Sequence, residues 1–196
     1  WTSVGSFDWT PGEALANDLV TAPSTLNGTS QLYFQASLAS LNAPVTGLPI
    51  IGTGLGTDYE ITAIAASGEI GTLVGGTVLL LAFDNTNSTN YVKIYYDTAK
   101  NANPLLGTGF DDGTLLMEGI VTAGGGNFLI TNLNQQGIPI PVQFDQFASL
   151  ASNNYPGVGT VVGNGSSVAT ANIDPTTINS TYITPSGTSV LSFTLN

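Results

Sequence analysis

Five oxygen-bearing side chains gather in one long loop, and they are the strongest candidates for chemistry in this sequence. They are Asp97, Asn101, Asn103, Asp111 and Asp112. Calcium takes its ligands from carboxylates, side-chain amides and backbone carbonyls on flexible loops. The spacing does not follow the EF-hand pattern, in which ligands alternate around a central glycine. The same residue types also cap turns by accepting backbone N–H groups, so calcium binding and turn formation are two alternatives.

Acid–base catalysis has few candidates. The chain contains no histidine, cysteine or arginine, and its two lysines are Lys93 and Lys100. A glycosidase needs two suitably spaced carboxyl groups. The pairs of that kind are Asp58 with Glu60 and Asp111 with Asp112. A Ser–Lys dyad would need one of the lysines, but alternation within residues 91–96 predicts that Lys93 is a solvated strand residue. We therefore predict no catalytic residue, no resident cofactor and no enzyme activity.

The charge balance narrows the range of partners. The formal net charge is −11, the sequence pI is about 4.1, and charged residues make up 8% of the chain. Nucleic-acid binding is excluded, because a polyanion needs many cations to neutralise it. A surface covered by hydroxyl and amide groups opposes contact between copies less than a charged surface does. The apolar run at residues 77–83 is too short to cross a bilayer, which needs about 20 residues.

Aromatic residues offer a second type of binding surface. The candidates are Trp1, Phe7, Trp9, Tyr33, Phe34, Tyr95 and Tyr96. Exposed tyrosine and tryptophan rings stack on sugars, because they have flat apolar faces and polar tips. The alternative is that these rings alternate between the core and the surface of a sheet. Four glycosylation sequons occur at about the frequency expected by chance, at Asn27, Asn87, Asn164 and Asn179.

Strand patterns dominate the rest of the chain. Apolar or alternating runs occupy residues 31–38, 59–65, 77–83, 91–96, 114–121, 127–133, 142–147, 160–162, 167–173 and 190–195. We predict one antiparallel β-sandwich or jelly-roll domain over residues 1–196, with long loops at 42–57 and 98–113. Residues 10–19 have the cap signals of a short helix. The three glycines at 124–126 predict a hairpin tip.

The two ends of the chain suggest assembly. Aromatic and aliphatic residues concentrate there, at Trp1, Phe7, Trp9, Val190, Leu191, Phe193 and Leu195. A terminal strand must pair with something, and a neighbouring copy can accept it into its own sheet. We predict that residues 1–10 or 184–196 are exchanged between subunits.

Several segments resemble the flocculation-associated PEP-CTERM proteins, a family also known as PepA. They are residues 95–116 (YYDTAKNANPLLGTGFDDGTLL), 7–15, 32–41, 59–62, 145–147 and 154–163. The resemblance implies an exported bacterial protein of the exopolysaccharide matrix that helps cells to hold together in flocs. The family has no assigned catalytic residues. Its sorting tail, with a Pro-Glu-Pro motif, does not follow Asn196, so the resemblance leaves anchoring by that route open.

Together these observations predict a secreted structural protein of the matrix or cell surface that associates with copies of itself. The most specific version of this prediction is a filament built by strand donation. The alternative is a module that binds exopolysaccharide through the loop and exposed aromatics, with or without calcium.

Overall fold

The regular secondary structure in the described part of the chain is all β-strand. The computed structural model describes residues 3–10, 12–17, 28–74, 78–84, 86, 90–104, 106–130, 144–145, 165–184 and 191–195. The strands found there are β1 (Ser6–Trp9), β2 (Glu13–Asn17), β3 (Gly28–Asn42), β4 (Glu60–Val74), β5 (Val78–Asp84), β6 (Tyr91–Asp97), β7 (Thr114–Ile130), β8 (Phe144–Asp145), β9 (Gly165–Ile178) and β10 (Leu191–Leu195). All their pairings within the sheet are antiparallel, which confirms the predicted all-β fold.

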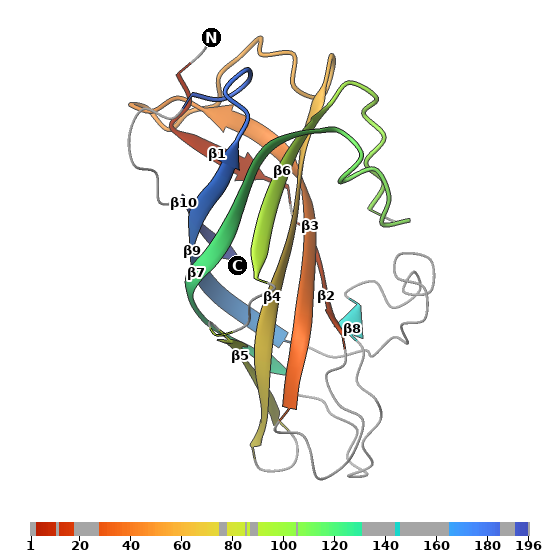
Figure 1. The fold of residues 1–196 in the computed structure, drawn as a ribbon, viewed down its shortest axis with the longest axis vertical. Coiled ribbons are helices and arrows are strands. Elements are labelled where there is room, and N and C mark those ends of the chain that lie inside the picture. Colours follow the sequence, from red (N-terminus) through yellow and green to blue (C-terminus); the bar gives the residue numbers. More distant parts are fainter. Residues whose placement is uncertain are drawn as a thin grey trace.

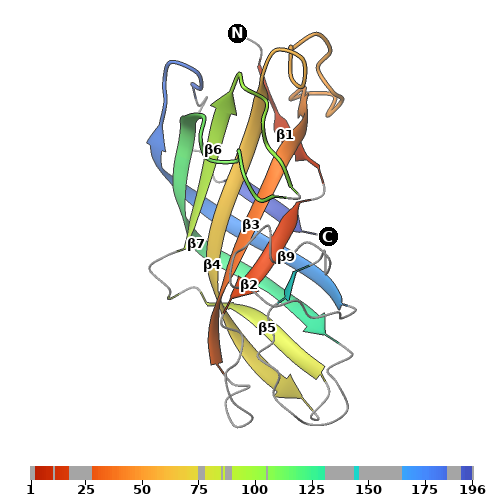
Figure 2. The same ribbon diagram turned by 90° about the vertical axis from the view of Figure 1, so that its right-hand side faces the viewer.

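The described strands form one ten-stranded sheet. Eight of them follow the order β10-β9-β7-β5-β4-β3-β2-β8, and the other two lie off this path, with β1 paired to β3 and β6 paired to β4 and β7. The four longest strands are β3, β4, β7 and β9. β3 and β4 run along the long axis of the molecule, and β7 and β9 curve across it (Figures 1 and 2). Shorter strands pair with these long strands, two along the same edge of one long strand. β1 and β2 both pair with β3, and β5 and β6 both lie between β4 and β7. Each short pair therefore acts as one long strand that is interrupted partway.

A buried asparagine bridges the interruption between β5 and β6. Asn90 is 3% exposed and lies where β4 changes its neighbour from β6 to β5. Its Oδ1 accepts the N–H of Gly68 at 2.6 Å, and its Nδ2 donates to the carbonyl of Asp84 at 2.8 Å. The side-chain amide thus replaces the backbone groups that an uninterrupted strand would supply, because buried backbone polar groups need partners.

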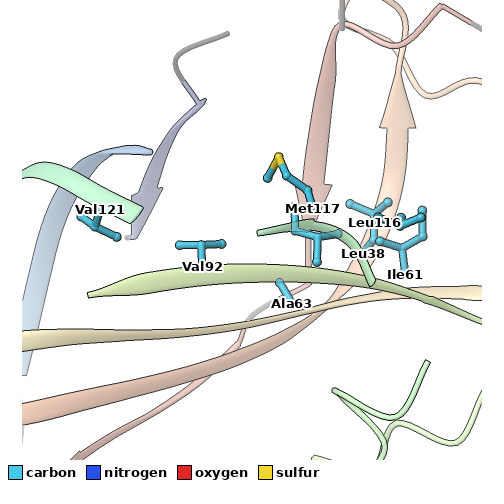
Figure 3. Packing of buried hydrophobic residues seen from close by; sticks show 8 residues of the cluster. Leu38, Ile61, Ala63, Val92, Leu116, Met117 and Val121 are labelled. Carbon is cyan, nitrogen blue, oxygen red and sulfur yellow. The ribbon is translucent and has the colours of Figure 1, made fainter. Parts of the chain in front are cut away.

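The hydrophobic core lies on the concave face of this curled sheet. Its buried members come from β3, β4, β6 and β7 (Figure 3): Leu38, Ile61, Ala63, Val92, Ile94, Leu116, Met117 and Val121. Phe7 and Trp9 of β1 and Ile178 of β9 pack against the same cluster. β1 and β9 are far apart in the strand order, so the sheet wraps around its core. One sheet encloses the core here, and the two-sheet sandwich is not seen among the described strands.

The helix predicted for residues 10–19 is wrong. Residues Glu13–Asn17 form β2, which pairs with Gln31–Gln35 of β3. The signals at Thr10 and Glu13 favour a helix in an isolated segment. In the folded chain, β2 instead satisfies backbone groups by pairing with β3 on one side and, at Leu15 and Ala16, with β8 on the other. Local propensity is a weak indicator when an open strand edge is adjacent.

The hairpin predicted at residues 124–126 is also wrong. The three glycines lie inside β7 and pair in register with Ala169–Ala171 of β9. They occupy the part of β7 between its pairing with β6, which ends at Ile120, and its pairing with β5, which begins at Asn127. Glycine in a strand often marks a bend or bulge, and a register shift lies just before them, between Val121 and Ala123.

Candidate functional site

The second predicted long loop folds back against the sheet. The described residues of this loop, 98–104 and 106–113, lie over the outer face of β3 and β4 (Figure 2). We call them the cover loop. Thr62 alternates with the core residues Ile61 and Ala63, so its side chain points to that outer face. It is 1% exposed, and its Oγ1 donates to the carbonyl of Phe110 at 2.8 Å. Phe110 is itself 4% exposed and holds the loop down as an apolar anchor.

Polar contacts fasten the other end of the cover loop. One carboxylate oxygen of Glu60 accepts the N–H groups of Asn101, at 2.7 Å, and of Ala102, at 3.0 Å. The Nζ of Lys100 donates to the carbonyl of Thr57. Glu60, one of the candidate catalytic carboxylates, therefore holds the loop on the sheet. Lys100, the alternative base for a Ser–Lys dyad, has the same role.

Close packing within the loop requires glycine at one position. Gly109 has φ +79°, a conformation that side-chain-bearing residues rarely adopt. A Cβ on Gly109 would lie 2.5 Å from the carbonyl oxygen of Asn101. Gly109 thus lets the backbone of the loop pack closely against Asn101.

Two members of the predicted calcium cluster cap turns. Oδ1 of Asp97 accepts the N–H of Ala99 at 2.8 Å. Oδ1 of Asn103 accepts the N–H of Leu106 at 3.2 Å. Both contacts span two or three residues, which is the local turn chemistry that competes with metal binding for these oxygens.

The other three members lie on the exposed side of the loop. Nδ2 of Asn101 donates to Oδ2 of Asp112 at 2.9 Å, and Asp111 and Asp112 are exposed. Within the described residues, no group of three or more histidine, cysteine, aspartate or glutamate side chains is arranged to hold a metal ion. The structure brings Asn101 and Asp112 together, while Asp97 and Asn103 are engaged in separate turns. Calcium binding by this loop stays a prediction.

The outer face beside the cover loop carries tyrosines. Tyr33 of β3 and Tyr91 of β6 both pair in register with Ala66 of β4, one from each side. Ala66 is 2% exposed, whereas Tyr33 is 36% exposed. Tyr95 occupies the same face of β6 as Tyr91, four residues further along. We call Tyr33, Tyr91 and Tyr95 the tyrosine face.

A charged pair crosses the tyrosine face. Lys93 lies between Tyr91 and Tyr95 on β6, and its Nζ is 3.0 Å from Oε1 of Glu118 on β7. The same Nζ lies 5.4 Å from the centre of the Tyr91 ring. Both charged side chains are about one-third exposed. Lys93 is therefore a partly exposed strand residue whose ammonium group is paired with Glu118.

Burial and hydrogen bonding favour one protonation state for three groups of this face. Burial raises the pKa of the Tyr91 and Tyr95 hydroxyls above the usual tyrosine range. The hydrogen bond to Glu118 raises the pKa of Lys93. At neutral pH Tyr91 and Tyr95 are therefore neutral and Lys93 is charged, which gives the face apolar rings, hydroxyl tips and one paired cation. Such a surface can stack on and hydrogen-bond to a sugar chain.

The predicted aromatic candidates divide between the two faces of the sheet. Phe7, Trp9 and Tyr96 pack against the core, and the rings of Phe7 and Trp9 meet edge to face with centroids 6.1 Å apart. Tyr33 and Tyr95 lie on the outer face, Phe34 is half-buried, and Trp1 lies outside the described residues. Tyr91 was missed among the sugar-stacking candidates. Its signal was the alternation of residues 91, 93 and 95 with the core residues Val92 and Ile94.

The predicted exchange of terminal segments can be compared with the pairing inside one chain. Phe7 and Trp9 belong to β1, which pairs with β3 of the same chain. Leu191, Phe193 and Leu195 belong to β10, which pairs with β9. Trp1 and Val190 lie outside the described residues. Exchange between copies would use these same registers and stays a prediction.

One sequon can be located. The amide nitrogen of Asn179 donates to the carbonyl of Leu115 at 3.3 Å, and its Oδ1 accepts the N–H of Thr181 at 3.2 Å. A glycan on this nitrogen would compete with the inward contact. Asn27, Asn87 and Asn164 lie outside the described residues.

A small pocket opens between the cover loop and the β1–β2 edge. Its volume is about 50 Å³, far below the roughly 300–1,000 Å³ of small-molecule sites. It is lined by Thr10, Gly12, Gln35, Ala36, Ser37, Pro104 and Phe110. The pocket is suited to water rather than to a substrate.

Comparison with known proteins adds no relative. No family model, curated protein or solved structure matches this chain. Over the described residues, the structure has no helix long and apolar enough to cross a membrane. Function must therefore be argued from the surfaces described above, and the resemblance to the PEP-CTERM family stays a prediction.

Proposed function

We propose that this chain is a secreted, non-enzymatic structural protein of the extracellular matrix or cell surface, and that copies of it associate through the edge of the sheet at β10. In the sharpest form, strand donation along this edge builds a filament that supports the cohesion of flocs or biofilm. The observation that carries the proposal is the position of β10 at the end of the strand order.

The chemistry of β10 supports pairing with another chain. β10 pairs with β9 along Leu191–Leu195, and it has no second neighbour among the described strands. An edge strand presents a row of backbone N–H and C=O groups that can accept a further strand. Proteins that avoid such contacts place lysine, proline or a bulge on the edge. The sequence Leu-Ser-Phe-Thr-Leu has no charged residue and no proline.

The test places charge on this edge. We expect Ser192→Lys combined with Thr194→Lys to abolish assembly, because two copies would then bring like charges together along the joint. Thr177→Lys, on an exposed position of β9 outside the segment that pairs with β10, is the matched control. Electron microscopy and sedimentation velocity measure the assembly state. Filaments that persist in the double variant, or an intact chain that stays monomeric at high concentration, would sink the proposal.

A second candidate function is the binding of exopolysaccharide, and the tyrosine face favours it. Three tyrosines lie on one face of the two strands that flank β4, with a charged pair among them. Flat rings combined with polar groups are what carbohydrate-binding surfaces use. The adjacent cover loop supplies Asp111 and Asp112, which a calcium-dependent version of this function would use.

Polysaccharide pull-down separates this candidate from self-association. We expect Tyr91→Ala with Tyr33→Ala to weaken binding, whereas Tyr182→Ala, which removes an exposed tyrosine away from this face, leaves it unchanged. A chelator in the same experiment tests the calcium-dependent version. Binding that is equal for all variants would remove the tyrosine face from the model.

A further inference from the structure

The other long loop presents apolar side chains to solvent. Residues 43–57, which we call the tip loop, form most of the connection between β3 and β4, at one end of the long axis of the molecule (Figures 1 and 2). Val45 is 93% exposed, Ile51 is 89% exposed and Leu48 is 65% exposed. Three aliphatic side chains so fully in water at one loop mark a contact surface better than scattered exposed residues do.

The tip loop has a defined backbone conformation. Ala43 donates its N–H to the carbonyl of Leu48 at 2.9 Å, and Gly47 donates to Ala43 at 2.9 Å. Ile50 donates to the carbonyl of Leu41 at 2.8 Å. The exposed side chains are therefore held out by an ordered loop, and little conformational freedom is lost when they are buried in a contact.

The same hydrogen bonds set how deeply the loop can enter a lipid surface. Pro44 and Pro49 have no N–H group, so seven of the nine residues at 43–51 carry one. Four of those seven donate within the protein, because Leu48 also donates to Oγ1 of Thr46 at 3.3 Å. Unsatisfied backbone groups are what excludes most loops from the hydrocarbon region of a bilayer. The N–H groups of Val45, Thr46 and Ile51 need water as a partner, so the loop fits the hydrated interface with its side chains pointing inward, and not the hydrocarbon interior.

The charge distribution indicates which kind of lipid surface the tip loop can contact. Residues 42–57 contain no charged residue, while the whole chain carries a net charge of −11. A bilayer rich in anionic lipid would repel the molecule. Lys100 donates to the carbonyl of Thr57 at the base of the tip loop, but one cation does not offset a net charge of −11. A zwitterionic lipid surface leaves the apolar contact unopposed.

We infer that the tip loop inserts Val45, Leu48 and Ile51 into the interface of a zwitterionic lipid bilayer. A second copy of the chain fits less well, because a stable protein interface needs roughly 20–30 residues on each side and a shaped partner surface. Fluid acyl chains accept a few protruding side chains without such a surface, to a depth of about 5–10 Å. This inference is independent of strand pairing at β10.

The first test measures the surroundings of the tip directly. Because the chain has no cysteine, Val45→Cys, Ile51→Cys and the control Thr177→Cys each provide one attachment point for an environment-sensitive fluorophore. We expect phosphatidylcholine vesicles to shift the emission of the first two to shorter wavelength and to leave the third unchanged. No shift at either tip position, or an equal shift at all three, overturns the inference.

The second test removes the apolar groups. The variant Val45→Ser, Leu48→Ser, Ile51→Ser should lose at least about tenfold in partitioning onto phosphatidylcholine vesicles. Ile120→Ser, at a 50% exposed position on the sheet, is the matched control and should partition like the intact chain. Added phosphatidylglycerol should weaken binding of the intact chain. Unchanged partitioning of the triple variant contradicts insertion, as does a tip-dependent dimer that ignores vesicles.

Discussion

The two long loops of this protein treat their apolar residues in opposite ways. The cover loop buries Phe110 to 4% exposure against the sheet, while the tip loop leaves Val45 at 93% exposure. Both are rich in glycine, and both contain glycines with positive φ. The difference lies in their charged and polar anchors. Thr62 and Glu60 of β4 bind backbone groups of the cover loop, whereas the hydrogen bonds of the tip loop run mainly within itself. We infer that a loop packs against a sheet when side chains of the sheet form hydrogen bonds with the backbone of the loop.

The largest expected effect comes from removing the anchor of the cover loop. Phe110→Ala should lower the free energy of unfolding by about 3 kcal/mol, because it leaves a cavity against the sheet. Leu106→Ala in the same loop, at a 49% exposed position, should change it by less than about 0.5 kcal/mol. Urea denaturation measures both. Similar values for the two variants would mean that the loop is not held down by Phe110.

The polar tether should have the next largest effect. Glu60→Ala removes the acceptor for two backbone N–H groups and should cost about 1 kcal/mol, a value lowered by the partial exposure of the site. Glu60→Gln retains an oxygen acceptor and should cost clearly less. Urea denaturation and hydrogen exchange at Asn101 and Ala102 measure the two variants. Equal losses in both would show that the charge matters rather than the hydrogen bonds.

The tip loop should be nearly neutral for stability. The variant Val45→Ser, Leu48→Ser, Ile51→Ser should change the free energy of unfolding by less than about 1 kcal/mol, because these side chains are already in water. It should elute earlier from a hydrophobic-interaction column than the intact chain. A loss of stability as large as that of Phe110→Ala would show that the tip is packed and would remove the contrast between the loops.

The smallest effect is expected from calcium. Oxygens of Asp97 and Asn103 already accept backbone N–H groups, so excess calcium should raise the melting temperature by less than about 1 °C. Differential scanning calorimetry with calcium and then with chelator measures this. A rise of several degrees that Asp111→Asn abolishes would instead assign a calcium site to the cover loop.

Sequence reasoning identified most strands from their own patterns and failed where a neighbour decided the outcome. Alternation in residues 91–96 located β6 and the solvated position of Lys93. The strand β2 was mistaken for a helix, because the edge of β3 that it pairs with is not visible from Thr10 and Glu13. The glycines at 124–126 looked like a turn, since their pairing with Ala169–Ala171 depends on residues more than 40 positions away.

The candidate surfaces divide in the same way. The loops at 42–57 and 98–113 could be located from composition, but which of them would cover the sheet could not. That depends on Thr62 and Glu60, which sequence patterns placed in a strand without showing which groups they would bind. The tyrosine face required the register between β3, β4 and β6, since Tyr33 and Tyr91 are 58 positions apart and meet across Ala66.

The asparagine between β5 and β6 makes the molecule tolerant of added sequence. Asn90 restores the hydrogen bonds of the interrupted strand with its own side chain, so the register of β4 does not depend on how many residues separate Asp84 from Asn90. A peptide tag or a small foreign epitope could be inserted there while both flanking strands keep their neighbours. By the same reasoning, residues inserted at this interruption would enlarge the surface of the protein without changing how the strands of the sheet pair.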